Sequence, residues 1–236
     1  MTDARAERLQ RAYYASTAGT YDDAHIDAEE HRLGLHIMLA AIRHYDFGSI
    51  LDVGSGTGRA LTFVKSEVPA IRVVGIEPST ELRAVGHAKG LTPDELRYGN
   101  ALQLPFDDES FDLVCEFSAL HHIAEPGRAI SEMLRVARRG IFISDTNNFG
   151  QGSLVVRLIK QAINAVGLWP AADWVKTAGR GYSISKGDGV AYSYSVFNDW
   201  PEIRRQCRVV HVTNTDGGGI NPYRTAAHVA VLGLKR

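Results

Sequence analysis

The feature that most constrains this chain is a run of three glycines at alternate positions, Gly54, Gly56 and Gly58, placed directly after the apolar stretch 50–53, which contains Asp52. Such a stretch is typical of a buried parallel strand, and alternate glycines then force a tight turn without side chains into a helix. Glycine is needed because the backbone there takes unusual dihedral angles and comes within contact distance of a ligand. The stretch therefore predicts a strand, a nucleotide-class binding loop and a helix.

The residues around the glycines narrow the choice of ligand. A dinucleotide fingerprint requires glycine at the sixth position of the turn, where this chain has Arg59. A P-loop would need lysine followed by serine or threonine, and the chain has Arg59 and Ala60 there. An acid as close as Asp52 would also repel a bound pyrophosphate. The loop is therefore expected to serve a ligand with a cationic or donor-rich end.

An ordered series of motifs gives the loop its context. Residues 52–58 resemble motif I of the class I S-adenosylmethionine-dependent methyltransferases (Methyltransferase type 11-like family), written Asp-x-Gly-x-Gly-x-Gly. Later segments resemble the next motifs of that family in the same order, namely 73–79, 99–106, 110–114, 120–123 and 132–136. A single glycine-rich loop would be weak evidence. The resemblance rests on the whole set, which covers residues 50–145.

The alternation of apolar runs with helical segments predicts an α/β fold. Strands are expected near 49–53, 71–76, 95–99, 111–116 and 140–145, with helices near 59–67, 80–88 and 126–136. This interval predicts right-handed crossovers and a parallel sheet covered on both faces. Two more strands are expected near 208–212 and 227–233. Together with the resemblance, this implies a Rossmann-like, doubly wound, seven-stranded and mostly parallel sheet with an antiparallel last strand.

The chain is expected to form a single methyltransferase domain over residues 1–236, with four parts. These are an N-terminal helical cap or lid at 1–46, with helices near 3–15 and 27–44, a cofactor-binding core at 47–146, an insertion between strands five and six at 147–205, and the last two strands at 206–236. The insertion holds an apolar helix near 153–166 and many aromatic residues. These aromatics form either a satellite core or the wall of a substrate cavity, and the cavity is the preferred interpretation.

Polar residues follow the predicted strands, and ligands of such sheets bind beyond the carboxyl ends of the strands. The resemblance implies that Asp52 accepts a hydrogen bond from the cofactor's ammonium group and that Glu77 accepts both ribose hydroxyls. A helix cap or an exposed loop acid are the plainer alternatives. The full set expected to contact S-adenosylmethionine is Tyr21, Asp52, Gly54, Ser55, Gly56, Gly58, Glu77, Pro78, Asn100, Ala101, Leu102 and Ser118.

Two of these residues carry open alternatives. Asn100 stands where relatives usually have aspartate, and its side-chain oxygen can still accept from the adenine amino group. Tyr21 lies in a turn where many relatives place a tyrosine against the methionine end of the cofactor. It is either such a lid residue or a tyrosine that only anchors the turn.

The implied reaction is attack by an acceptor atom on the sulfonium methyl, which is already activated, so that alignment and desolvation supply much of the catalysis. A base is needed only if the acceptor arrives protonated. His121 and His122 follow strand four and are the candidates, although such a histidine often only braces the next helix. A catechol-type metal mechanism would want an acid directly after strand four, and 118–120 supply none. Metal independence is therefore expected.

Composition and charge argue against some classes of protein. A net charge of −1, from 26 basic and 27 acidic residues, makes a broad nucleic-acid surface unexpected. No apolar run approaches the roughly 18 residues of a membrane span, and the N-terminus lacks the apolar core of a signal peptide, so a cytoplasmic protein is expected.

Three functions are compatible with the sequence. The preferred one is methyl transfer to oxygen, nitrogen or carbon of a small, possibly aromatic or apolar molecule such as a metabolite, natural product or modified peptide. The second is a non-catalytic S-adenosylmethionine-binding or regulatory module. The third is a nucleotide-dependent oxidoreductase, which Arg59 disfavours.

Overall fold

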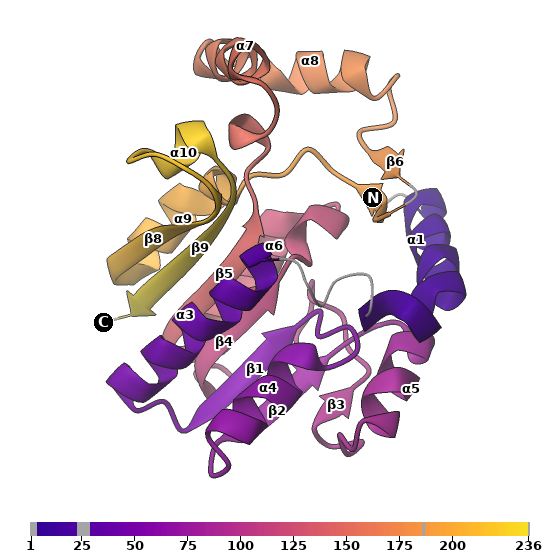
Figure 1. Cartoon of the computed structure of the whole chain (residues 1–236), viewed down its shortest axis with the longest axis vertical. Helices are drawn as coiled ribbons and strands as arrows, with labels where there is room; N and C mark the ends of the chain where they lie inside the picture. Colours follow the sequence, from indigo (N-terminus) through magenta and orange to yellow (C-terminus); the bar gives the residue numbers. More distant parts are fainter. Residues whose placement is uncertain (1–3, 23–28, 186, 236) are drawn as a thin grey trace.

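The computed structural model describes residues 4–22, 29–185 and 187–235 of the chain. Seven strands form one sheet in the order β3-β2-β1-β4-β5-β9-β8 (Figure 1). Their bounds are β1 Ser49–Val53, β2 Arg72–Ile76, β3 Leu96–Arg97, β4 Phe111–Phe117, β5 Ala137–Thr146, β8 Cys207–Gly217 and β9 Ala226–Lys235. The first five run parallel, and β9 pairs antiparallel with both β5 and β8. The predicted mostly parallel, seven-stranded sheet with an antiparallel last strand is confirmed.

Alternating side chains bury the sheet on both faces, as a period of two requires. One core joins Leu51, Val114 and Ile143 to α6 (Pro126–Val136) and α9 (Trp200–Gln206). The opposite core joins Ile50, Leu113 and Phe142 to α3 (Glu29–Tyr45) and α4 (Arg59–Glu67). A helix α5 (Thr80–Ala88) packs at the β3 edge. Apolar residues at consecutive strand positions thus serve two different helical layers.

The segments outside the sheet gather beyond the carboxyl ends of the parallel strands (Figure 1). Helix α1 (Ala4–Thr17) and the turn η1 (Ala18–Thr20) precede α3. After β5 come the turn η3 (Asn148–Gly150), the helices α7 (Leu154–Ala165) and α8 (Trp169–Lys176), the small hairpin β6 (Ser183–Ser185) and β7 (Gly189–Ala191), and the turn η4 (Val196–Asp199). The turn η2 (Leu120–His122) follows β4, and α10 (Pro222–Thr225) precedes β9.

Some boundaries differ from the prediction. The strand expected at 95–99 is paired only at Leu96 and Arg97, because the chain leaves the sheet edge for the turn at Asn100. The hairpin β6–β7 and helix α8 were not predicted. The start of the helix expected from residue 27 and of the one expected from residue 3 lies outside the described residues. Within the described part of the chain, no helix is both long and apolar enough to cross a membrane.

Candidate cofactor and acceptor site

Two adjoining cavities open at the carboxyl ends of the strands. The first, of about 210 Å³, lies beside the end of β2 and is called here the β2 cavity. The second, of about 300 Å³, is lined by His31, His121, His122 and His228 and is called the histidine cavity. They share the lining residues Tyr21, Gly54, Gly56, Phe117, Ser118 and His122. One ligand can therefore extend from the first cavity into the second.

The glycine loop forms the boundary between the cavities. The amides of Gly54 and Ser55 both donate to the carbonyl of Ile76, at 3.0 Å each, which fastens the loop to the end of β2. Gly54, Gly56 and Gly58 all have positive φ, as the motif requires. The backbone at Gly54 and Gly56 faces both cavities, and Ser55 faces the histidine cavity.

Gly58, the third glycine of the loop, differs from the first two in its surroundings. Gly58 lines neither cavity, in contrast to the predicted approach to the cofactor. A Cβ placed there would lie 2.1 Å from Cδ1 of Leu91, which is only 3% exposed. The positive φ and the packing against the core give a structural reason for glycine at this position, and the predicted ligand contact of Gly58 stays a prediction.

Glu77 occupies the centre of the β2 cavity wall. Its carboxylate accepts hydrogen bonds from the amides of Gly56 (3.0 Å) and Ser79 (2.7 Å), and its residue is 4% exposed. Burial raises the pKa of Glu77 to about 7, although the two amides oppose this shift. The cavity is also lined by Pro78, Asn100, Ala101 and Leu102, the residues predicted to contact adenine.

Asn100 and Tyr21, the two predicted cofactor contacts with open alternatives, both line the β2 cavity. The Oδ1 atom of Asn100 accepts from the amide of Leu102 at 2.9 Å, so one of its two lone pairs is already used. Tyr21 lines both cavities, and its ring lies within 3.8 Å of the point where a Cβ on Gly56 would stand. This position suits a side chain that closes over a ligand at the loop.

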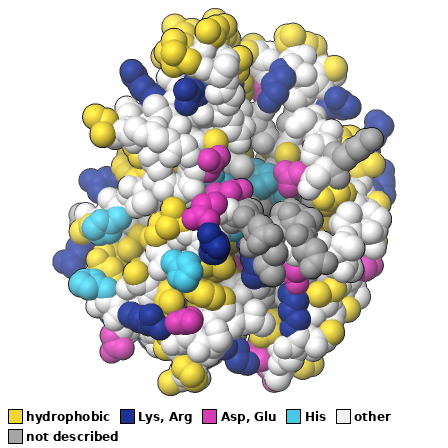
Figure 2. All heavy atoms as spheres, in the orientation of Figure 1, with side chains coloured by type: hydrophobic (Ala, Val, Ile, Leu, Met, Phe, Trp, Pro, Cys, Tyr) yellow, Lys and Arg dark blue, Asp and Glu magenta, His cyan; other side chains and the backbone are white. Residues whose placement is uncertain are grey.

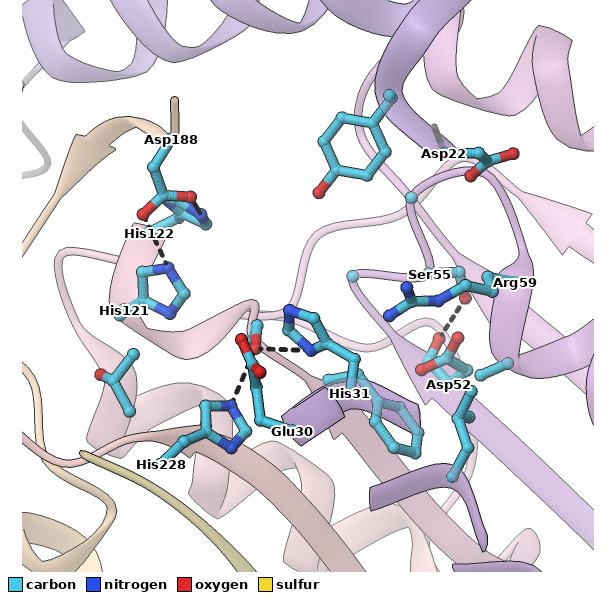
Figure 3. A pocket seen from close by; sticks show the side chains of 18 of the residues that line it. Asp22, Glu30, His31, Asp52, Ser55, Arg59, His121, His122, Asp188 and His228 are labelled. Carbon is cyan, nitrogen blue, oxygen red and sulfur yellow. Dashed lines mark hydrogen bonds and ion pairs between the residues drawn. The ribbon is translucent and has the colours of Figure 1, made fainter. Parts of the chain in front are cut away.

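Asp52 lies across the histidine cavity from the histidine pair, beside Arg59 and Ser55 (Figure 3). The hydroxyl of Ser55 donates to the backbone carbonyl of Asp52 at 2.9 Å. The carboxyl is 2% exposed, and burial raises its pKa to about 6 against weaker opposing effects of Ser55, Cys115 and Arg59. A buried carboxylate at a cavity wall is suited to receive a cationic group.

His121 and His122 lie next to each other with a ring separation of 4.0 Å. Nδ1 of His121 lies 2.7 Å from Oδ1 of Asp145, which is fully buried. Burial disfavours the charged imidazole, but Asp145 and Asp188 outweigh it and raise the pKa of His121 to about 10. Nδ1 of His122 lies 2.6 Å from the carbonyl of Val190. Both histidines therefore reach the cavity with their Nε2 atoms.

Sequence reasoning missed several residues of the histidine cavity. His228 is not among the predicted site residues, but it lines the cavity, and its Nε2 lies 3.1 Å from the hydroxyl of Ser118. His31 lies 3.4 Å from the same hydroxyl. Asp188 comes from the turn before β7, and Glu30 from the first turn of α3. No spacing signal links these residues, because they come from separate elements of the sheet edge and its covering segments.

The insertion contributes less to the cavities than expected. Its residues at the cavities are Gly187 and Asp188 in one, and Val190 and Tyr192 in the other. The residues Tyr182, Val190 and Tyr192 also pack with Ala6 as a small satellite core, which was the other interpretation of the aromatics. Trp174 on α8 is 64% exposed and lines neither cavity.

The strand order, the glycine loop and the acid at the end of β2 define the class I methyltransferase fold, a Rossmann-like architecture with an antiparallel strand in the sheet. A family model described as a methyltransferase domain matches residues 51–144. Residues 51–144 therefore form a methyltransferase domain of the class I S-adenosylmethionine-dependent kind, and S-adenosylmethionine is the methyl donor that this family implies.

Similar curated proteins are also methyltransferases. A phosphatidylethanolamine N-methyltransferase of Cereibacter sphaeroides is 36% identical over 121 residues, which cover 49% of this chain and 58% of that protein. A demethylmenaquinone methyltransferase of Roseiflexus castenholzii is 36% identical over 94 residues, 39% of this chain and 40% of that protein. The chain thus spans about half the length of the curated relatives that it matches.

Solved structures support the fold over nearly the whole chain. A chain from the complex between the Haloferax volcanii Trm112 methyltransferase activator and a methyltransferase superimposes with a TM-score of 0.63 at 18% identity, covering 96% of this chain and 97% of that one. A Thermotoga maritima S-adenosylmethionine-dependent methyltransferase gives a TM-score of 0.60 at 16% identity, covering 95% and 99%. At these identities the likeness concerns the fold alone.

Proposed function

We propose that the chain catalyses methyl transfer from S-adenosylmethionine to a small-molecule acceptor by direct displacement. The observation that carries this proposal is the continuity of the two cavities across the glycine loop, with Glu77 on one side and Asp52 on the other. The adenosine part would lie in the β2 cavity, with its ribose on Glu77. The methionine ammonium would face Asp52, which leaves the sulfonium methyl directed toward the histidine cavity.

The acceptor would occupy the rest of the histidine cavity, and the character of the lining supports a polar acceptor group. Imidazoles, carboxylates and a guanidinium surround this space, whereas the aromatics of α8 lie elsewhere. The named relatives act on phosphatidylethanolamine and demethylmenaquinone, so acceptors with a polar head and an apolar remainder deserve the first screening. An oxygen, nitrogen or carbon atom of that head is the proposed methylated atom.

Helix α1 is proposed to act as a cap over the cofactor. Its residues Ala6, Gln10 and Tyr14 line the β2 cavity, and Gln10 accepts from the amide of Val190 at 2.6 Å. The N-terminal segment and the insertion therefore meet over the cavity, as a cap that excludes water would require. The proposed division into cap (1–46), core (47–146), insertion (147–205) and final strands (206–236) follows the same arrangement.

The test has two stages. Isothermal titration with S-adenosylmethionine and S-adenosylhomocysteine measures cofactor binding, and release of S-adenosylhomocysteine is then followed with phosphatidylethanolamine, a quinol and small polar amines and phenols. Binding with turnover supports the proposal. Binding without turnover of any acceptor, beside an active relative in parallel, would favour the non-catalytic binding module. Absence of cofactor binding would refute both.

A further inference from the structure

Three side chains with metal-ligand atoms converge on the wall of the histidine cavity. Nε2 of His121 lies 3.4 Å from Oδ2 of Asp188, and Nε2 of His122 lies 3.3 Å from Oδ1 of the same carboxylate. Figure 3 shows the carboxylate facing the two neighbouring rings. Among the described residues these are the three His, Cys, Asp or Glu side chains whose ligand atoms all lie within 4.8 Å of one another.

In each imidazole, the contact made by Nδ1 fixes the direction in which Nε2 points. Nδ1 of His122 lies 2.6 Å from the carbonyl of Val190, which can only accept, so that Nδ1 must carry a proton. Nδ1 of His121 lies 2.7 Å from the buried carboxylate of Asp145. Histidines that bind metals generally donate their other ring N–H to a carboxylate or a backbone carbonyl. Both histidines have this support.

This arrangement directs the Nε2 atoms of two imidazoles and one carboxylate at each other. Such a group repels itself unless positive charge lies between its members, either as protons on the Nε2 atoms or as a cation. The spacing fits a cation, because two ligands about 2.1 Å from a tetrahedral metal are roughly 3.4 Å apart. The observed separations from Asp188 are 3.4 Å and 3.3 Å.

We propose that His121, His122 and Asp188 form a binding site for one divalent transition-metal cation, with Asp145 and the carbonyl of Val190 holding the two imidazoles. Two imidazoles and one carboxylate suit Zn²⁺ or Fe²⁺ and leave at least one coordination position open. The metal independence expected from the sequence rested on the lack of an acid directly after strand four. The acid comes instead from the β6–β7 hairpin, 66 residues after His122.

The open coordination position would face the histidine cavity. A hydroxyl bound there would lose its proton more readily, because a cation stabilises the oxyanion. This role of the cation rests on the proposed methyl transfer, whereas binding of the cation does not. The two can therefore be tested separately.

The experiment uses the full chain after dialysis against a chelator. Zn²⁺ is titrated by calorimetry, and Co²⁺ is titrated with its visible absorption as the readout. We expect one saturable site per chain, with affinity at least tenfold lower in His121→Ala and Asp188→Asn, and roughly tenfold lower in Asp145→Asn. The matched controls His44→Ala and Asp94→Asn remove an exposed histidine and an exposed aspartate and should bind like wild type.

Circular dichroism and S-adenosylmethionine titration of the same samples establish that each variant is folded. The proposal is overturned if the wild type shows no saturable binding, or if Asp188→Asn and a folded His121→Ala bind Zn²⁺ as wild type does. Protons shared with Asp188 would then account for the cluster. Metal binding without cofactor binding would instead refute the proposed function and leave the metal site standing.

Discussion

Glu77 at the end of β2 accepts a hydrogen bond from the backbone amide of Gly56, with 3.0 Å between Oε2 and N. Its other oxygen accepts from the amide of Ser79, at 2.7 Å, at the start of α5. One carboxylate thus joins the glycine loop to the neighbouring strand and helix. Each oxygen has a second lone pair that can accept another hydrogen bond, as two adjacent hydroxyls of a ligand would require.

We expect Glu77→Gln to lower the affinity for S-adenosylmethionine by roughly tenfold to a hundredfold, because a charged acceptor and one of its two oxygens are lost. Calorimetric titration measures the change. Glu81→Gln, an exposed acid in the first turn of α5, is the matched control and should bind within about twofold of wild type. Equal affinity of wild type and Glu77→Gln would remove Glu77 from the cofactor site.

The buried carboxyl of Asp52 makes a pH-dependent contribution to stability. Its folded-state pKa of about 6 lies above the ordinary value of 3.8, because burial disfavours the charge. Between these values the folded state binds more protons than the unfolded state, so stability falls as pH rises. We expect wild type to lose roughly 2–3 kcal/mol relative to Asp52→Asn between pH 4 and pH 7. Urea unfolding of both proteins measures this difference, and a constant difference would contradict it.

Cofactor binding should show the opposite pH trend. The raised pKa values of Asp52 and Glu77, about 6 and about 7, mean that a cationic, hydroxyl-bearing ligand must drive their ionisation. The affinity for S-adenosylmethionine is therefore expected to rise from pH 5 to pH 8, with proton release on binding at pH 6. Titration in two buffers of different ionisation enthalpy detects the protons. Affinity that is flat over this range in wild type, or that keeps its slope in Asp52→Asn, would exclude Asp52 as the partner of the cation.

The cofactor side of the molecule was readily predicted from the sequence. The helices expected at 59–67, 80–88 and 126–136 are observed at those residues, because local periodicity and the glycine turn specify them without help from distant contacts. Asp52, Gly54, Gly56 and Glu77 all reach one edge because parallel strands end there.

The acceptor side could not be predicted in the same way. Asp188 and His228 reach the histidine cavity from a two-stranded hairpin and from an antiparallel strand, and their positions depend on how long connections fold back. Local sequence gives no register for such contacts. For Gly58 the motif predicted a ligand contact, and packing against Leu91 gives a structural reason for glycine that the motif alone does not reveal.

This interpretation of Gly58 has a direct test. Alanine at this position would combine a positive φ of 72° with a clash against Leu91, and we expect it to destabilise the fold by about 2–4 kcal/mol. Gly90→Ala is the matched control, because Gly90 has a φ of 96° but open space around its Cα. That control should cost about 1–2 kcal/mol, from backbone strain alone. Thermal unfolding gives both values, and equal destabilisation would show that backbone strain alone explains Gly58.

Helix α7 has its apolar face toward solvent. Leu154, Val155, Leu158 and Ile159 are 53–64% exposed, and hydrophobic side chains gather at this tip of the molecule in Figure 2. The polar residues face inward instead. Gln161 donates to the carbonyls of Phe149 (3.0 Å) and Arg224 (3.1 Å). The spacing of apolar residues at a period of 3.6 predicted this helix correctly, but here the apolar face of the helix is not its buried face.

Substitutions on the two faces of α7 should therefore have effects opposite to those of an ordinary amphipathic helix. We expect Leu158→Gln to change the free energy of unfolding by less than about 0.5 kcal/mol, because that side chain is already 55% exposed. We expect Gln161→Leu to cost about 1–3 kcal/mol, because two backbone carbonyls lose their donor. Urea unfolding at low protein concentration gives both values. A loss above 1 kcal/mol for Leu158→Gln, or none for Gln161→Leu, would mean that α7 packs the other way round.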